Sequence, residues 1–179
     1  MSESLRIAGI ESDSIVDGPG LRLAVFLQGC PHNCPGCHNP QTHDPNGGYS
    51  VTFGEILEEI KRNPLLDGVT FTGGEPFLQA GKLTALATSI KSLGLSIMAY
   101  TGYTWEELLE SPERSALLPC LDTLADGRFD ITKKSLELAF TGSTNQRLID
   151  VRKSLESGQV ALDPMDFRVS SMALNGSGW

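Results

Sequence analysis

Three of the four cysteines of this chain lie within eight residues. Cys30, Cys34 and Cys37 form a CxxxCxxC pattern in a stretch rich in proline and glycine, which we call the cysteine loop (residues 28–44). Three thiolates so close together can ligate one small metal centre, and iron–sulfur clusters are natural occupants of such sites. A [4Fe–4S] cluster would keep one iron open to a small molecule unless Cys120 ligates it. An open metal position is typical of a reactive centre rather than a structural one.

Two other interpretations of the cysteine loop use the same residues. A zinc ion could be held by the three cysteines together with His32, His38 or His43. A disulfide is the second alternative, but nothing at the N-terminus resembles a signal peptide, and the cysteines of cytosolic proteins usually bind metals or act in catalysis.

Composition restricts the class of protein. With 179 residues, the chain is expected to form one domain whose hydrophobic core is large enough to be stable without disulfide bonds. No apolar run approaches the roughly 20 residues that span a bilayer. Fourteen Lys and Arg against 22 Asp and Glu give a net charge of −8, which argues against nucleic acid or an anionic membrane as a partner.

Short apolar segments recur along the chain and are followed by polar or glycine-rich turns. Residues 21–28 are almost continuously apolar, as in a buried parallel strand, and the cysteine loop begins at their end. Ligand chemistry in parallel α/β folds is built at the carboxyl ends of strands. Further strands are predicted at 5–10, 68–72, 95–100 and 121–125.

Helices are predicted between these strands. Capping-box patterns at residues 52–55 and 104–107 mark two helix starts, and apolar residues at helical spacing over 83–93 predict another helix that ends near Gly94. The alternation predicts a parallel α/β sheet. Because a complete eight-fold barrel takes about 250 residues, we expect an incomplete, open parallel β/α barrel.

The pattern weakens toward the C-terminus. A helix within 132–140 and a last strand near 147–151 are predicted. The stretch beyond Ser157 lacks periodicity, so we predict a domain of residues 1–157 and a tail, 158–179, of uncertain order.

A second candidate site follows the predicted strand at 68–72. Gly73, Gly74, Glu75 and Pro76 form what we call the glycine turn. Glycines lack the Cβ atoms that keep a ligand from the main chain, so carbonyl groups there could accept hydrogen bonds from an ammonium group. The alternative is an ordinary turn between strand and helix. If both sites share one rim of the sheet, the ligand would carry an amine and a carboxylate.

Several stretches together resemble the radical S-adenosylmethionine superfamily, whose hallmark is CxxxCxxC after the first strand and a GGE-type turn after the second. The chain is most similar to activases of glycyl radical enzymes, and among them to those of anaerobic ribonucleoside-triphosphate reductase. The stretches that carry the resemblance are DGPGLR, QGCPHNCPGCHNPQT, TGGEP, YTGYTWEEL, ADGRF and GSTNQR. The chain departs from the family's sequence pattern at His43, where tryptophan is expected, and at residues 131–138.

The resemblance implies a site for two cofactors. Cys30, Cys34 and Cys37 would ligate a [4Fe–4S] cluster, and the fourth iron would bind the amine and carboxylate of S-adenosylmethionine. Asp126 is the least certain contact, because aspartate before glycine is also a common turn residue. The residues expected at S-adenosylmethionine are Gly36, Cys37, His38, Gly73, Gly74, Glu75 and Asp126.

The resemblance also implies an activity. The reduced cluster would cleave S-adenosylmethionine, and the resulting 5′-deoxyadenosyl radical would take a hydrogen atom from a glycine in the glycyl radical domain of the reductase. A cytoplasmic location and an electron donor such as flavodoxin or ferredoxin are expected. The alternatives are an activase of another glycyl radical enzyme, such as pyruvate formate-lyase, and a non-catalytic iron–sulfur or zinc module.

Overall fold

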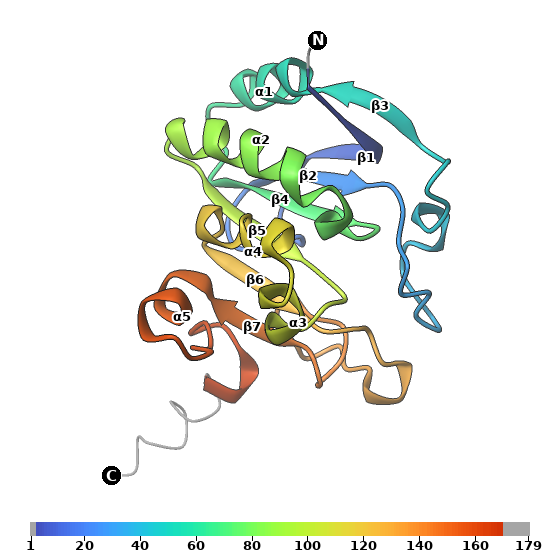
Figure 1. The fold of residues 1–179 in the computed structure, drawn as a ribbon, viewed down its shortest axis with the longest axis vertical. Helices are drawn as coiled ribbons and strands as arrows, with labels where there is room; N and C mark the ends of the chain where they lie inside the picture. The colour runs from blue at the N-terminus through green and yellow to red at the C-terminus, as the bar shows by residue number, and fades with distance from the viewer. Residues whose placement is uncertain (1–2, 170–179) are drawn as a thin grey trace.

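One seven-stranded sheet organises the computed structural model, which describes residues 3–169 (Figure 1). The strands lie in the order β3-β1-β2-β4-β5-β6-β7, so β3 and β7 form the edges. All predicted strands form, and β3 is an additional one. The bounds are β1 Ser4–Ser14, β2 Arg22–Leu27, β3 Tyr49–Thr52, β4 Gly68–Gly73, β5 Ser96–Tyr100, β6 Thr123–Asp126 and β7 Arg147–Asp150.

Only the middle of the sheet is parallel. β2, β4, β5 and β6 run parallel to one another, whereas β1 is antiparallel to β2 and β3, and β7 is antiparallel to β6. The prediction of a parallel sheet is therefore right for these four strands and wrong for β1 and β7. Parallel neighbours need a crossover of about a dozen residues, and the short connection between β1 and β2 allows only an antiparallel pair. The architecture is mixed α/β.

The helices cover the sheet and bury its apolar side chains. Both predicted capping boxes are present, with Thr52 and Thr104 as the N-caps of α1 and α3. α2 crosses the central strands in Figure 1, and its Leu83, Leu86 and Ile90 belong to the same buried core as the sheet. The helices are α1 Phe53–Arg62, α2 Ala80–Ser92, α3 Trp105–Leu109, α4 Pro112–Ser115 and α5 Val151–Ser157, with 3-10 turns at Pro40–Thr42, Pro76–Gln79, Leu118–Cys120 and Ile131–Lys133.

One helix prediction was wrong, and another was right except for its last residue. Residues 132–140 do not form a helix: after the 3-10 turn Ile131–Lys133 the chain is irregular, and Leu136 is 91% exposed, so no apolar face packs on the sheet there. Leu93 caps α2 instead of joining its buried side, because the helix ends before Gly94, whose φ is +81°.

The residues after α5 return to the sheet as far as they are described. Asp163 N–H donates to the Leu148 carbonyl at 2.9 Å, and the Asp166 carboxylate accepts from Leu148 N–H at 2.9 Å. Residues 158–169 thus pack along β7, and the rest of the predicted tail lies outside the described residues.

β2 begins with a buried arginine. Arg22 is 1% exposed, and its guanidinium donates to the carbonyls of Pro19 and Val69 at 3.0 and 2.7 Å and to Thr70 Oγ1 at 2.6 Å. Burial lowers the pKa of Arg22, because it removes the charged group from water. These bonds tie the connection between β1 and β2 to strand β4.

Candidate active site

The cysteine loop leaves the carboxyl end of β2 and is closed by main-chain hydrogen bonds. Gly29 N–H donates to the Thr42 carbonyl at 2.7 Å, which brings the two ends of the loop together. Within the loop, Cys37 N–H donates to the Cys34 carbonyl at 3.1 Å and forms a turn. The loop therefore doubles back, as its proline and glycine content predicts.

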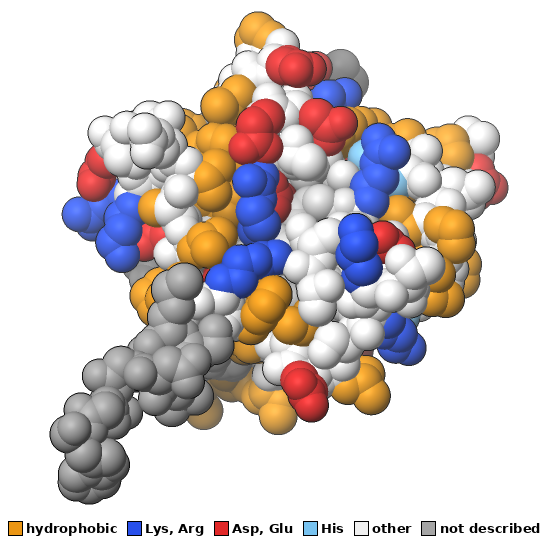
Figure 2. All heavy atoms as spheres, turned by 90° about the horizontal axis from the view of Figure 1, so that it is seen from below, with side chains coloured by type: hydrophobic (Ala, Val, Ile, Leu, Met, Phe, Trp, Pro, Cys, Tyr) orange, Lys and Arg blue, Asp and Glu red, His pale blue; other side chains and the backbone are white. Residues whose placement is uncertain are grey.

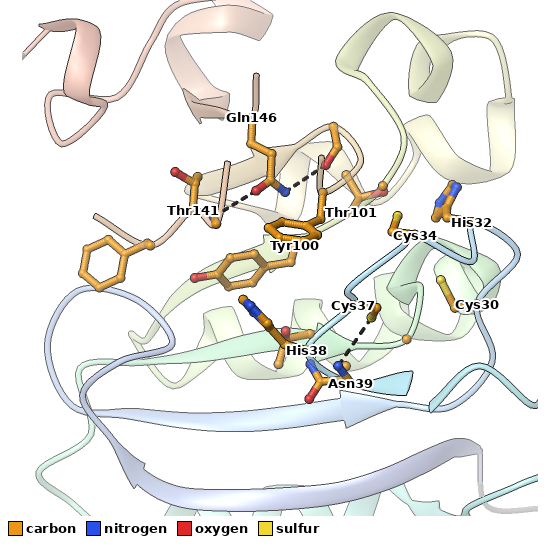
Figure 3. Close-up of a pocket in the computed structure, with 18 of the residues that line it drawn as sticks. Cys30, His32, Cys34, Cys37, His38, Asn39, Tyr100, Thr101, Thr141 and Gln146 are labelled. Atoms are coloured by element: carbon orange, nitrogen blue, oxygen red, sulfur yellow. Dashed lines mark hydrogen bonds between the residues drawn. The ribbon is translucent and has the colours of Figure 1, made fainter. Parts of the chain in front are cut away.

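All three cysteines of the loop line one cavity of about 420 Å³. Such a volume lies in the usual range for small-molecule sites, roughly 300 to 1,000 Å³. In Figure 3 the cysteine loop forms one side of the cavity, Gln146 and Thr141 form the other, and Tyr100 lies between them. The cavity thus opens at the carboxyl ends of the parallel strands, where the sequence predicts a site.

Main-chain N–H groups face the sulfur atoms. Asn39 N–H lies 3.4 Å from Cys37 Sγ, and N–H groups of the loop and of Phe129 face Cys30 and Cys34, respectively. Burial is the largest influence on the Cys30 and Cys34 thiols and raises the pKa of both. Metal binding must therefore release protons from these thiols, while the N–H groups favour the thiolate form that a metal requires.

The spacing of the donors fits a cluster. Between residues 3 and 169, no three Cys, His, Asp or Glu side chains converge on a point where they could hold one metal ion. A [4Fe–4S] cluster is ligated at separate iron atoms, so its thiolates need not converge. Three thiols around one cavity of this size, with N–H groups facing the sulfurs, suit that geometry.

The glycine turn lines the same cavity and packs tightly against β2. A Cβ atom on Gly73 would lie 2.7 Å from Phe26 Cα, and one on Gly74 would collide with the carbonyl oxygen of Gly29. Packing alone therefore requires both glycines. Both also border the cavity, so the structure is compatible with a ligand at this turn as well.

Glu75 is fully buried and does not line the cavity. Its Oε1 accepts hydrogen bonds from Thr101 Oγ1 at 2.9 Å and Phe77 N–H at 3.0 Å. Its Oε2 accepts from Gly102 N–H at 2.8 Å and lies 2.7 Å from His32 Nε2. All four of these hydrogen-bond partners are protein groups, so the carboxylate links the cysteine loop to the segments that follow β4 and β5.

The two residues that flank Cys37 differ in position. His38 lines the cavity and packs its ring against Phe129, with 5.2 Å between the ring centres. Gly36 is outside the set of lining residues, and a Cβ there would meet the end of the Ile131 side chain at 2.6 Å. Its φ of +74° explains glycine at this turn.

Asp126 is buried at the end of β6 but faces a neighbouring hollow. Its carboxylate accepts from Trp105 N–H at 2.7 Å and pairs with Arg147, whose Nε and Nη2 lie 3.0 and 2.5 Å away. Arg147 also contacts Glu106 at 2.9 Å. The side chain thus joins α3 to β7 and lies apart from the cysteine cavity.

Several residues that line the cavity were not predicted as site residues. Tyr100 ends β5, and burial raises the pKa of its phenol, with a further contribution from the charge of Asp17. Its position at the carboxyl end of a parallel strand was a usable signal. Phe140 and Gln146 come from the irregular segment after β6; no local pattern marks Phe140, whereas Gln146 belongs to the GSTNQR stretch that carries part of the resemblance. Gln146 holds that segment by accepting from Gly142 N–H and donating to the Gly127 carbonyl, both at 2.9 Å (Figure 3).

Cys120 is remote from this cavity. It ends the 3-10 turn Leu118–Cys120, packs partly buried against the main core, and has Thr88 Oγ1 at 4.0 Å. It is not among the residues that line the cavity.

The surface charge is mixed even though the chain is acidic. Figure 2 shows the lower face, where Lys and Arg side chains gather near the centre between apolar and acidic side chains. Among residues 3–169, no helix combines the length and the apolar character needed to cross a membrane.

Comparisons with known proteins agree with the cysteine chemistry. Residues 16–149 match the family model described as a 4Fe-4S single cluster domain. The anaerobic ribonucleoside-triphosphate reductase-activating protein of Vibrio cholerae is 33% identical over 141 residues, which cover 74% of this chain and 89% of that protein. The chain belongs to this family of activating proteins. The match confirms the predicted resemblance and an iron–sulfur cluster as the family's cofactor.

Other similar proteins show the breadth of this family. The Escherichia coli K12 reductase-activating protein is 32% identical, covering 74% of this chain and 90% of that protein. Pyruvate formate-lyase-activating enzyme of Clostridium pasteurianum is 42% identical over 114 residues, but these cover 59% of this chain and only 48% of that enzyme. Among solved structures, QueE from Escherichia coli has a TM-score of 0.48 and 20% identity, covering 56% of this chain and 53% of QueE. That likeness is too low to support an argument.

Proposed function

We propose that this protein is a radical S-adenosylmethionine activase that generates a glycyl radical on an anaerobic ribonucleoside-triphosphate reductase. The observation that carries the proposal is the single cavity bordered by three cysteines of one loop and by the glycine turn. The family supports the reductase as partner, because relatives named as its activating proteins match across 74% of this chain.

In this proposal, Cys30, Cys34 and Cys37 hold the [4Fe–4S] cluster. His38 closes one wall of the cavity through its packing on Phe129. The N–H groups that face the sulfurs orient and stabilise the thiolates. Leaving the fourth iron without a protein ligand is consistent with the remote position of Cys120.

S-adenosylmethionine occupies the rest of the cavity in this proposal, beside Gly73, Gly74 and His38. When bound, the reduced cluster would supply one electron that breaks a carbon–sulfur bond of S-adenosylmethionine, giving methionine and a 5′-deoxyadenosyl radical, and this radical would take a hydrogen atom from the partner's glycine. Main-chain carbonyls of the glycine turn, rather than the occupied Glu75 carboxylate, accept from the methionine ammonium. Asp126 acts on this site only through the packing of α3 and β7.

The proposal also covers the fold type, the cellular location and the electron donor. The mixed sheet, with separate edges at β3 and β7, supports an open barrel of the radical S-adenosylmethionine type, formed by a domain of residues 1–157. The predicted tail, 158–179, follows this domain, and its described part, 158–169, packs along β7. We expect the protein to work in the cytoplasm, with flavodoxin or ferredoxin as electron donor and without nucleic acid or membrane as partner.

A matched pair of cysteine variants tests the proposal. The protein is reconstituted with iron and sulfide without oxygen, reduced with dithionite, and assayed for 5′-deoxyadenosine release. Cys34→Ala is expected to lose release, since one cluster ligand is gone, whereas Cys120→Ala is expected to retain it. A cluster-loaded native protein that releases no 5′-deoxyadenosine would refute the proposal, and so would a Cys120→Ala variant that binds no cluster.

The partner is tested separately, because the 42% identity to a pyruvate formate-lyase-activating enzyme favours a second candidate. The loaded protein is mixed with each candidate enzyme, and the glycyl radical is recorded by electron paramagnetic resonance. A radical on the reductase alone supports the proposal. A radical on pyruvate formate-lyase alone would assign this chain to the second candidate.

A further inference from the structure

His32 lies between two of the cysteines, yet its side chain points into the protein. The side chain is 4% exposed, and its Nε2 lies 2.7 Å from Oε2 of Glu75, which is 0% exposed. Three other donors already face this carboxylate, from Thr101, Phe77 and Gly102. The imidazole thus connects a side chain of the cysteine loop to this network, beside a main-chain hydrogen bond from Glu75 N–H to the Gly29 carbonyl at 2.8 Å.

The ring of His32 is also enclosed on its other sides. Its edge meets Tyr103, with ring centres 4.6 Å apart and planes at 76°. The guanidinium of Arg114 covers Tyr103 at 4.0 Å. A Cβ on Gly102 would lie 2.7 Å from His32 Nε2, so glycine at this position makes room for the ring. The imidazole is thus held in one orientation by packing as well as by hydrogen bonding.

The main chain of the same residue faces a cluster ligand. His32 follows Cys30 by two residues, and the main-chain N–H groups of His32 and Asn33 lie near enough to the Cys30 sulfur to favour its thiolate form. An imidazole fixed on Glu75 fixes its own main-chain N–H and the one that follows. Hydrogen bonds to ligand sulfurs influence both the retention of an iron–sulfur cluster and its reduction potential.

We propose that His32 is a positioning residue that fastens the cysteine loop to Glu75, so that Cys30 and the N–H groups facing it keep their orientation toward the cluster. The proposal rests on the proposed function, because it assumes the cluster. It also gives the buried carboxylate of the glycine turn a role other than contact with S-adenosylmethionine. His32 itself transfers nothing to the substrate.

Three variants and one matched control test this link in the full-length protein. His32→Phe keeps an aromatic ring and removes the donor, whereas His32→Gln keeps an N–H donor at a similar reach. Glu75→Gln replaces one acceptor oxygen by a donor that faces His32. His43→Phe is the control, because it makes the same replacement in the same loop at a side chain outside the cavity.

The first measurement needs no cluster. Each apoprotein is alkylated under reducing conditions at one pH and a temperature below its unfolding transition, and labelling of each cysteine is followed by mass spectrometry, with Cys120 as the internal reference. Without the hydrogen bond between His32 and the Glu75 carboxylate, the loop should open more often. The labelling rate of Cys30 should therefore rise about tenfold or more. His32→Phe and Glu75→Gln are expected to show this increase, His32→Gln much less of it, and His43→Phe none.

The second measurement uses reconstituted protein. The variants that label faster are expected to retain less iron per chain and to show a changed electron paramagnetic resonance spectrum and midpoint potential of the reduced cluster, with recovery in His32→Gln. Native labelling, spectrum and potential in His32→Phe would overturn the inference, even if its melting temperature fell. If native protein binds no cluster, the proposed function fails, whereas the labelling result still decides whether His32 holds the loop.

Discussion

Replacing single glycines by alanine can separate two reasons for glycine at the candidate site. Gly74→Ala introduces a Cβ that collides with the Gly29 carbonyl oxygen and lies 3.0 Å from the Leu27 carbonyl oxygen. Gly73→Ala adds a similar collision with Phe26 at a residue whose φ is +93°. Gly94→Ala meets nothing within 4 Å, although its φ is +81°. Gly74→Ala therefore tests the steric contact alone, Gly94→Ala tests the backbone conformation alone, and Gly73→Ala tests both effects together.

The expected magnitudes follow from these contacts. A left-handed conformation costs a residue with a side chain about 1 to 2 kcal/mol, which is the whole expected effect of Gly94→Ala. Overpacking against main chain that cannot rotate away typically costs about 1 to 3 kcal/mol, which is the expected effect of Gly74→Ala. Gly73→Ala combines both and should lose about 2 to 5 kcal/mol of unfolding free energy.

Urea unfolding of the cluster-free protein measures these losses, and thermal unfolding offers a check. In a chain of this size, each 1 kcal/mol lowers the melting temperature by about 2 to 4 °C. The order of destabilisation should be Gly73→Ala, then Gly74→Ala, then Gly94→Ala. Equal losses in Gly73→Ala and Gly94→Ala would refute the reasoning, because the contact with Phe26 would then contribute nothing.

Three further predictions concern stability. Arg22→Met removes a buried donor and leaves the carbonyls it satisfied unpaired, so chemical unfolding should show a loss of about 2 to 4 kcal/mol; a loss within error of zero would contradict the bonds described. His43 Nε2 is buried and has no hydrogen-bond partner within residues 3–169, so His43→Phe should gain about 1 kcal/mol, and a loss of stability would argue for an unseen partner. The hydrogen bond from Arg147 lowers the pKa of Glu106 below its ordinary 4.5, so this pair stabilises the protein above that pH and the benefit disappears as pH falls through the lowered value. Because the Glu106 side chain is 61% exposed, Glu106→Gln should cost no more than about 1 kcal/mol at pH 7, and this cost should shrink as the pH is lowered below 4.5; a cost that stays constant as the pH falls would contradict the assignment.

Much of the fold could be predicted because its signals are local. The capping boxes at Thr52 and Thr104 each depend on residues within one turn of helix, and both are present. Continuous apolar runs marked the buried strands, since a strand covered on both faces has little room for polar side chains. Strand direction was harder, because it depends on connections and neighbours rather than on the strand itself.

The amino-acid sequence by itself determined that three thiols share one short loop at the end of a strand, since their spacing and the apolar run before them are local properties. Only the tertiary structure decided which polar groups meet there. It joined His32 to Glu75 across 43 residues, turned Asp126 toward Arg147 and away from the cavity, and brought Gln146 to its wall. Such contacts depend on how distant strands pack, and the free energy that selects them comes from burying the whole core rather than from any pattern within one segment.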